Sequence, residues 1–574
     1  MHLIPRRAVG LTLGATLIVG LPTVAVAGSN GDDFVRGADK AQQGHRPPHG
    51  TGNMIFIHPD GTDAAYWEAG RIYWDGPDAV SQWDLLPEMT VYRGHMADQL
   101  DGTSNGGATV HAFGYKVDGP GSYGTDSGAK NVLRGDVDPP RAIKALSGYP
   151  GSWLRQAGNA GHPIGVINDG DIAEPGTGAF LAEVATRNDP NGIVAQIIQG
   201  RPGFRAGDAN RYQDPVVIMG GGEENFLPAK TPYCTPQQIS GAKSQGSIPL
   251  DCLVHRPAGA TLTDEVPTTG GTRTDGINML KAAADKGYTI VRTRTEFERL
   301  RADLAAKDVD PGQLKILGLF ADEDIFNDEP EESLIARGLV DDSVSKNAKG
   351  TNLVLFGSEP GTPGYNPPTA AEMNEVGLIV LQAHAKRTGR PFGLVSEVES
   401  TDNFGNTNNA IGALAAVDVA NGVIGAARDF QAHHPRTLIL TAADSSGGAP
   451  QVSGINIDEE IPATVGSVPV NPTGAEKNED DAPQNPLDGR YGRGSAPFLA
   501  APDQFGQRLP FAIAWTGGPD FNGGIVTRAQ GLNAHLLDSA LSDRFDNVDV
   551  YRMAHLTLFG KALKYPTGTT APTR

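Results

Sequence analysis

Acidic residues follow three strand-like apolar runs of this 574-residue chain, and their placement is the first sign of chemistry. Asp60 comes directly after one run, Asp444 follows another, and Glu397, Glu399 and Asp402 follow a third. Carboxylates that meet at one edge of a sheet repel one another strongly unless cations lie among them. The pattern therefore predicts a divalent-metal site, and a solvated acidic rim is the alternative interpretation.

A second motif places two hydroxyl groups, those of Thr103 and Ser104, where a helix is expected to begin. Small residues follow them, and Gly114 lies near the expected end of this helix. The N–H groups and the positive dipole end of a helix N-terminus attract a phosphoryl group and favour a nucleophilic alkoxide. Taken alone, the motif favours a plain capping serine.

The elements that could position these residues alternate along the chain. Short apolar runs alternate with helical patterns, which is typical of a mostly parallel sheet with helices on both faces. The clearest helical patterns span residues 371–386 and 410–433. We expect strands at Met54–His58, Ile164–Ile167, Pro215–Met219, Tyr288–Val291, Leu314–Phe320, Phe392–Ser396, Thr437–Thr441 and Pro510–Trp515. The sequence thus predicts an α/β three-layer sandwich formed by one domain over residues 52–565.

Two loop-rich stretches interrupt this rhythm and are interpreted as insertions on the one domain. They span about residues 228–276 and 453–502. The first contains the only two cysteines of the chain, Cys234 and Cys252. A single disulfide between them is the favoured interpretation in an oxidising compartment.

Residues 1–27 have the pattern of a cleavable export signal. Two arginines precede an apolar run, which ends before Pro22 and an A-x-A cleavage site at Ala27. A polar arm over residues 28–51 follows, and residues 566–574 form a short tail. No later segment is apolar for long enough to span a bilayer, so we expect a periplasmic or secreted protein without a membrane span after cleavage.

The charge and composition limit the classes of partner and fold. With 67 acidic and 47 basic residues the formal net charge is −20, which argues against binding to nucleic acid. A negative protein still accepts a phosphate substrate, because metal ions at a site reverse the local sign. The 74 glycines and 42 prolines indicate many turns and long loops instead of a helical bundle.

In this order, the segments described above resemble those of the alkaline phosphatases, from about Asn53 to Gly560. Framework phrases such as Met-Gly-Gly-Gly at 219–222 and Leu-Gly-Leu-Phe-Ala at 317–321 belong to the same resemblance. It implies that Ser104 is the nucleophile. The metal ligands that it implies are Asp60, Glu174, Glu397, Asp402, Asn406, Asp444, Ser445 and Asp520.

The resemblance also implies a phosphate-binding arginine, Arg187, thirteen residues after Glu174. A guanidinium group suits a phosphoryl group because it offers two parallel N–H donors. Whether Glu397 or Glu399 occupies the family's carboxylate position for the third metal stays open. It also stays open whether Gly176 or Thr177 occupies the position of the family's threonine ligand.

The chain departs from the family pattern at its metal ligands. The family has histidines where this chain has Asn406, Ser445 and Asp520, so each change replaces an imidazole nitrogen by an oxygen ligand. Imidazole suits zinc, whereas oxygen ligands suit Mg²⁺, Ca²⁺ or Mn²⁺. We therefore expect Mg²⁺ or Ca²⁺, accept Mn²⁺, and disfavour Zn²⁺. Three upstream histidines are expected to be structural and away from the site: His58, His95 and His111.

The function implied by the resemblance is an exported, metal-dependent phosphomonoester hydrolase that acts on small phosphorylated substrates through a phosphoserine intermediate. A phosphodiesterase or related hydrolase on the same fold stays open, since fold does not determine substrate. A non-catalytic protein that binds phosphorylated ligands is the second alternative. A homodimer is a possible oligomeric state.

Overall fold

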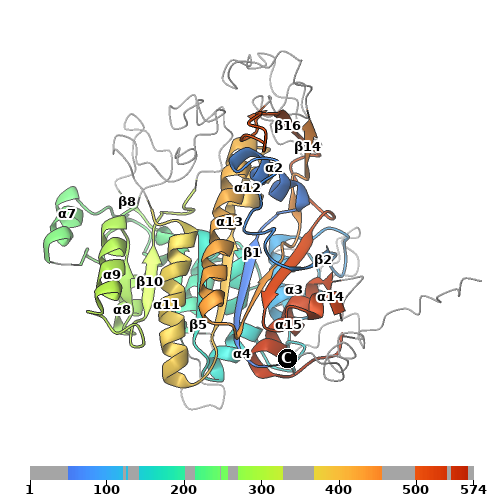
Figure 1. Cartoon of the computed structure of the whole chain (residues 1–574). Coiled ribbons are helices and arrows are strands. Elements are labelled where there is room, and N and C mark those ends of the chain that lie inside the picture. The colour runs from blue at the N-terminus through green and yellow to red at the C-terminus, as the bar shows by residue number, and fades with distance from the viewer. Residues whose placement is uncertain are drawn as a thin grey trace, which may run out of the picture.

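A ten-stranded sheet runs through the middle of the protein, in the computed structural model as drawn in Figure 1. From one edge to the other its strands are β19 (Phe545–Asp546), β2 (Glu88–Arg93), β18 (Val526–Gly531), β12 (Thr437–Thr441), β1 (Asn53–Pro59), β11 (Gly393–Val398), β5 (Ile164–Asp171), β6 (Val217–Gly221), β10 (Ile316–Leu319) and β9 (Thr289–Val291). The seven strands from β12 to β9 are parallel, and β18 and β2 join by antiparallel pairing. This order confirms the predicted mostly parallel sheet.

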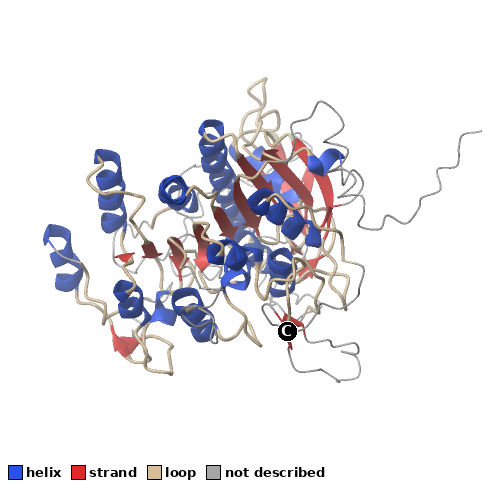
Figure 2. Ribbon diagram, turned by 90° about the horizontal axis from the view of Figure 1, so that it is seen from below, coloured by secondary structure: helices blue, strands red, loops and turns tan. Residues whose placement is uncertain are grey.

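Helices cover both faces of the sheet, as Figure 2 shows. Side chains alternate across a strand, so Met54 and Phe56 of β1 pack on one face, and Ile55 and Ile57 on the other. The first face carries α3 (Ser104–Phe113), α4 (Trp153–Asn159), α5 (Pro175–Leu181), α6 (Pro190–Gln199), α8 (Met279–Asp285) and α15 (Asn547–Phe559). The second carries α2 (Ala64–Trp74), α9 (Arg294–Ala306), α11 (Ala370–Thr388) and α13 (Ala410–His433). The predicted three-layer α/β sandwich is thereby confirmed.

Further elements lie outside the central sheet. The remaining ones are β3 (Thr125–Asp126), β4 (Arg141–Ala142), η2 (Glu223–Phe226), β7 (Thr231–Pro232), α7 (Pro236–Gln245), β8 (Thr269–Gly270), α12 (Ser400–Asn406), β13 (Ser446–Gly447), β14 (Pro450–Gly454), β15 (Phe498–Leu499), β16 (Pro510–Trp515), β17 (Asp520–Phe521) and α14 (Leu536–Ser539). The predicted strand Pro510–Trp515 exists, but it pairs with β14 and β15 in a separate sheet. Apolar content predicted the strand, but it does not reveal which strand will be its partner.

The 24-residue helix α13 is strongly apolar and lies in the core. Among the described residues, it is the one helix that is long and apolar enough to cross a membrane. However, 72% of its most apolar window is buried within the fold. Its apolar side chains, among them Leu414, Val417 and Ile424, lie in the core on the α2 and α11 side of the sheet. This burial is typical of a core helix.

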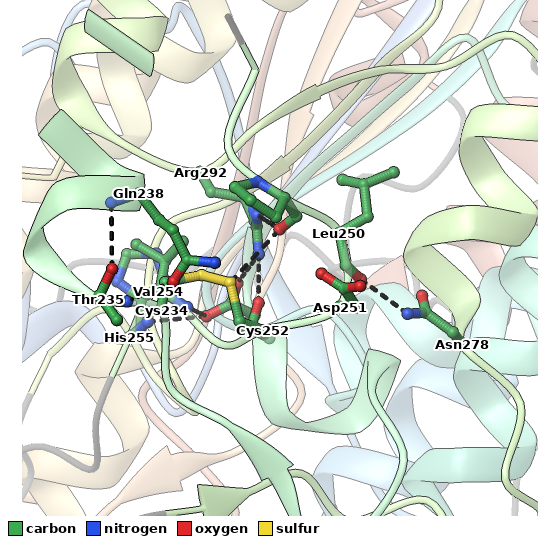
Figure 3. Close-up of a disulfide and its surroundings, with 12 residues drawn as sticks. Cys234, Thr235, Gln238, Leu250, Asp251, Cys252, Val254, His255, Asn278 and Arg292 are labelled. Carbon is green, nitrogen blue, oxygen red and sulfur yellow. Dashed lines mark hydrogen bonds and ion pairs between the residues drawn. A yellow bond between two sulfur atoms is a disulfide. The ribbon is translucent and has the colours of Figure 1, made fainter. Parts of the chain in front are cut away.

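The structure describes residues 50–119, 125–126, 141–200, 214–245, 247–255, 269–326, 367–454, 498–539 and 545–566. The proposed export signal, nearly all of the polar arm, most of the second insertion and nearly all of the tail lie outside these residues. In the first insertion, Cys234 and Cys252 form a disulfide, as favoured from the sequence (Figure 3).

Candidate active site and metal centre

The predicted carboxylates meet at one edge of the sheet because β1 lies between β11 and β12. All three strands are parallel, so the residues that follow them collect at the same edge. Asp60, Glu397 and Glu399 offer oxygen atoms that all lie within 4.8 Å of one another. Asp60 also lies within this distance of Asp444. Strand order alone therefore brings acids that are far apart in the sequence into one buried cluster.

Several polar atoms of this cluster are buried and have no hydrogen-bond partner. They are Asp60 Oδ2, Glu399 Oε2, Asp402 Oδ1, Asp444 Oδ2 and both ring nitrogens of His58. Burying a charged or polar group without a partner costs free energy, and several like charges in one place add repulsion. Divalent cations remove both penalties, and carboxylate oxygens are suitable ligands for them. The donor set therefore fits divalent metal ions.

Asp60 lies at the centre of the cluster. Its backbone N–H donates to Val398, and its Oδ1 accepts a hydrogen bond from the Gly61 N–H at 2.9 Å. Burial, and then the negative charge of Asp444, raise the pKa of Asp60 well above its usual range. Burial alone would also raise the pKa of Asp444, but close contact with Asp60 and His58 lowers it below its usual range. The two carboxyl groups thus titrate as a coupled pair.

Glu397 and Glu399 form the second part of the cluster. Glu397 accepts hydrogen bonds from the Gly176 N–H at 2.8 Å and from the Asn168 side chain at 2.6 Å. Burial raises the pKa of Glu397 to about 7. Burial, and then the charge of Glu397, raise the pKa of Glu399 well above its usual range. Both glutamates therefore lie in the cluster, although the sequence had left open which of the two belongs to it.

Asp402 and Asn406 of α12 form a neighbouring group with Asp520 of β17. The Asn406 side chain donates a hydrogen bond to Asp402 Oδ2 at 2.6 Å. Burial, and then the charge of Asp520, raise the pKa of Asp402 well above its usual range. Burial and the charge of Asp444 raise the pKa of Asp520 to about 6. Ser445 is buried beside the cluster, and its hydroxyl donates to Asp444 Oδ1 at 3.3 Å.

The expectation that His58 is a structural residue away from the site is wrong. Its Nε2 lies 3.6 Å from oxygen atoms of both Asp60 and Asp444, and its Nδ1 lies 3.8 Å from Glu397. The centre therefore contains an imidazole beside the oxygen donors, and the oxygen-only ligand set stays a prediction. The prediction failed because His58 lies inside β1, where only the register with Glu397 on β11 shows which way it points.

The other two upstream histidines fit the structural role expected for them. His111 is buried in α3, and its Nε2 shares a hydrogen bond with the Tyr92 hydroxyl at 2.6 Å. Burial, together with the charge of His58, lowers the pKa of His111 well below its usual value. His95 contacts Lys116 at the edge of the fold, and burial lowers its pKa.

Ser104 is the first residue of α3, and Thr103 caps this helix. The Thr103 hydroxyl accepts from the Gly106 N–H at 3.2 Å and donates to the Gly119 carbonyl at 2.9 Å. Ser104 Oγ makes no hydrogen bond to any described residue, so Thr103 and not Ser104 caps the helix. A Cβ at Gly107, in the first turn, would overlap the Asp444 side chain. The start of α3 therefore lies against the carboxylate cluster.

Arg187 and Glu174 form an ion pair, in which Arg187 Nη2 lies 2.7 Å from Glu174 Oε2. The positive charge of Arg187 lowers the pKa of both Asp402 and Asp520, so the guanidinium group lies near the cluster. Glu174, predicted as a metal ligand, directs its carboxylate at this arginine. The structure thus places it where it orients Arg187.

Two residues of the cluster were outside the predicted ligand set, His58 and Glu399. A histidine in an otherwise apolar strand, two residues before a strand-end aspartate, is the signal that could have indicated His58. Glu399 lies two residues after Glu397, and the sequence left open which of the two is in the metal register.

Comparisons with known proteins agree with this geometry. The alkaline phosphatase family model matches residues 51–467. Streptomycin-6-phosphate phosphatase from Streptomyces griseus is 28% identical over 233 residues, which is 39% of this chain and 46% of that protein. The match therefore spans about half the length of this curated relative.

Solved structures of low sequence identity share the fold. Alkaline phosphatase from the Antarctic bacterium TAB5 superposes with a TM-score of 0.51 at 14% identity, over 89% of this chain and 98% of that chain. A variant of that enzyme with Mg bound in its M3 site gives 0.50 at 15% identity, over 89% and 99%. The Thermus thermophilus alkaline phosphatase gives 0.56 at 16% identity, over 90% and 93%. This chain belongs to the alkaline phosphatase family.

Proposed function

We propose that this protein is an exported, metal-dependent phosphomonoester hydrolase that works through a phosphoserine intermediate on small phosphorylated substrates. The observation that carries the proposal is the contact between the start of α3, where Ser104 lies, and the cluster of buried, unpaired carboxylates around Asp60. If the cluster were purely structural, the fold would not need beside it a serine whose hydroxyl has no hydrogen-bond partner among the described residues. The name of the Streptomyces griseus relative, a phosphatase of a phosphate monoester, supports the same substrate class.

The residues of this chain divide the chemistry among them. Divalent cations held by the carboxylates supply Lewis-acid stabilisation of the charge on the phosphoryl group. Ser104 Oγ attacks phosphorus and displaces the alcohol, and the phosphoserine is then hydrolysed by water. Arg187, held in orientation by Glu174, and the N–H groups at the start of α3 bind the equatorial oxygens, where the charge lies.

Export is part of the proposal and rests on two observations. Residues 1–27 have the pattern of a cleavable signal, which implies a periplasmic or secreted protein. The disulfide between Cys234 and Cys252 is typical of an oxidising compartment. Protein recovered outside the cytoplasm, beginning at Gly28, supports this part, whereas an intact N-terminus on cytoplasmic protein contradicts it.

The experiment compares p-nitrophenyl phosphate with bis-p-nitrophenyl phosphate as substrates for the mature protein. The protein is first treated with a chelator and then reloaded with Mg²⁺, Ca²⁺ or Mn²⁺. We expect hydrolysis that depends on the added ion and a clear preference for the monoester. A preference for the diester identifies a phosphodiesterase, and phosphate binding without turnover identifies a non-catalytic protein.

A further inference from the structure

A pocket of about 470 Å³ opens where α11 and α13 end and where β1 begins. The two helices pack side by side in Figure 1. β1 runs from this pocket to the carboxylate cluster, because Asn53 lines the pocket and Asp60 follows the last residue of the strand. At about 3.3 Å per residue, the pocket and the cluster are roughly 20 Å apart. The pocket is therefore separate from the proposed active site.

The ionisable side chains that line the pocket are all of the basic kind. They are Lys386, Arg390, His433, His434 and Arg436, and no described carboxylate lies among the lining residues. The whole chain, in contrast, has a formal net charge of −20. Burial, and then the positive charges of Lys386 and His433, lower the pKa of His434. The positive charges of the pocket are thus close enough to act on one another.

The helix dipole alone can explain a cation in the last turn of a helix. Arg387 of α11 fits that explanation, because it does not line the pocket and its Nη2 donates to His384 Nδ1. Arg390 and Arg436, however, lie outside both helices. Arg436 donates from Nε and Nη2 to the Thr51 carbonyl, which holds its guanidinium group at the wall of the pocket. The dipoles therefore do not account for the positive charge gathered around this cavity.

We propose that the pocket binds a small anion with two or more phosphate groups, such as a short polyphosphate. Ammonium and guanidinium groups suit phosphate oxygens, and a guanidinium group offers them two parallel N–H donors. A terminal phosphate group carries about 1.5–2 negative charges at neutral pH, so two such groups balance the charges of Lys386, Arg390 and Arg436. The volume lies within the roughly 300–1,000 Å³ that is typical of small-molecule sites.

Calorimetry with tripolyphosphate on the full mature chain tests the proposal. The protein is stripped of metal with a chelator and dialysed, so that metal-dependent hydrolysis does not interfere. Lys386→Glu and Arg390→Glu are each expected to weaken binding about tenfold or more, because a hydrogen bond between charged groups commonly contributes that much. Both side chains are exposed, and neither forms an ion pair with a described carboxylate, so thermal unfolding should change little.

Arg387→Glu is the matched control for these variants. It makes the same change of charge one residue from Lys386, but outside the pocket. We expect it to weaken tripolyphosphate binding less than about threefold in physiological salt, because exposed charges outside the site are screened. Sedimentation with phosphatidylglycerol vesicles distinguishes a free anion from a lipid headgroup, and we expect the protein to stay in solution.

Several results overturn the proposal. Wild-type protein that does not bind tripolyphosphate has no such site, and unchanged affinity in folded Lys386→Glu and Arg390→Glu places the anion outside the pocket. An equal loss of affinity in Arg387→Glu identifies a general effect of surface charge. Vesicle binding that requires Lys386, without binding of tripolyphosphate, identifies a membrane contact instead. None of these measurements involves hydrolysis, so they test the pocket independently of the proposed function.

Discussion

Buried carboxylates occur in two contrasting settings in this protein. Glu223, near the disulfide loop, is fully buried and pairs with Arg292 at 2.8 Å. Its second oxygen accepts hydrogen bonds from the N–H groups of Val254 and His255. Around Asp60 the carboxylates lie against one another and against His58, and Arg187 is paired with Glu174. One arginine balances one buried acid in the first setting, whereas several acids meet in the second, and we infer that divalent ions complete their neutralisation.

The largest effect is expected from Ser104→Ala, which tests whether the ion-dependent setting serves chemistry. Loss of a nucleophile lowers kcat by roughly three to six orders of magnitude. Thermal unfolding should change little, since Ser104 Oγ has no hydrogen bond to a described residue. Steady-state kinetics with p-nitrophenyl phosphate provides the measurement.

Thr103→Val is the matched control for that experiment, because its hydroxyl caps α3. It should cost about 0.5–2 kcal/mol of stability and leave most of the activity. Near-full activity in Ser104→Ala together with an inactive Thr103→Val would place the nucleophile one residue earlier.

The second prediction compares the two settings directly, through opposite changes in the free energy of unfolding. Glu223→Gln leaves Arg292 buried without its charge partner and should destabilise the protein by about 3–5 kcal/mol. Asp60→Asn removes one of several buried acids that repel one another, so metal-free protein should be as stable as the wild type or more stable. Denaturant unfolding of chelated proteins measures both. Equal destabilisation by the two substitutions would abolish the distinction between the settings.

The third prediction concerns Arg187, which combines features of both settings. It is paired to Glu174, as a structural arginine is, yet its charge reaches Asp402 and Asp520. Arg187→Lys should weaken inhibition by inorganic phosphate by about 1.5–3 kcal/mol, because lysine cannot offer two parallel donors. Turnover should fall with it. Unchanged phosphate inhibition removes Arg187 from the site and leaves it a structural ion pair.

The smallest effect is expected in the pH dependence of stability. Burial raises the pKa of Glu397 from 4.5 to about 7, so its proton is bound more tightly in the folded state. Metal-free protein should therefore lose stability as pH rises through the window between these values. Metal-loaded protein should lose less, because the cation compensates the carboxylate. The difference in Tm between the two forms should grow from pH 5 to pH 8, and a constant difference contradicts this account.

The sequence predicted the central strands well and the antiparallel edge poorly, for a physical reason. β1, β11 and β12 are buried on both faces and are apolar along most of their length, which marks them clearly. In β2 and β18 burial alternates along the strand but polarity does not follow it, because Met89 and Val91 are exposed while Thr90 and Thr527 are buried. Strand existence was therefore easier to predict than strand partnership.

For the site as well, residues at strand ends were easier to predict than contacts that depend on strand pairing. Asp60, Glu397 and Asp444 were predictable because they follow strands that end at one edge. His58 was not, because its direction depends on the pairing of β1 with β11. The pairing of Glu174 with Arg187 depends on the turn after α5, for which the sequence has no strong signal.

The central claim is that the carboxylate cluster and Ser104 form one ion-dependent phosphoryl-transfer site. The most direct test is rapid acid quenching during turnover, followed by mass spectrometry of the peptide that contains Ser104. We predict a phosphoryl group on Ser104 in ion-loaded protein and none in chelated protein given the same substrate. Steady turnover without a phosphoryl group on Ser104 at any quench time would contradict the account.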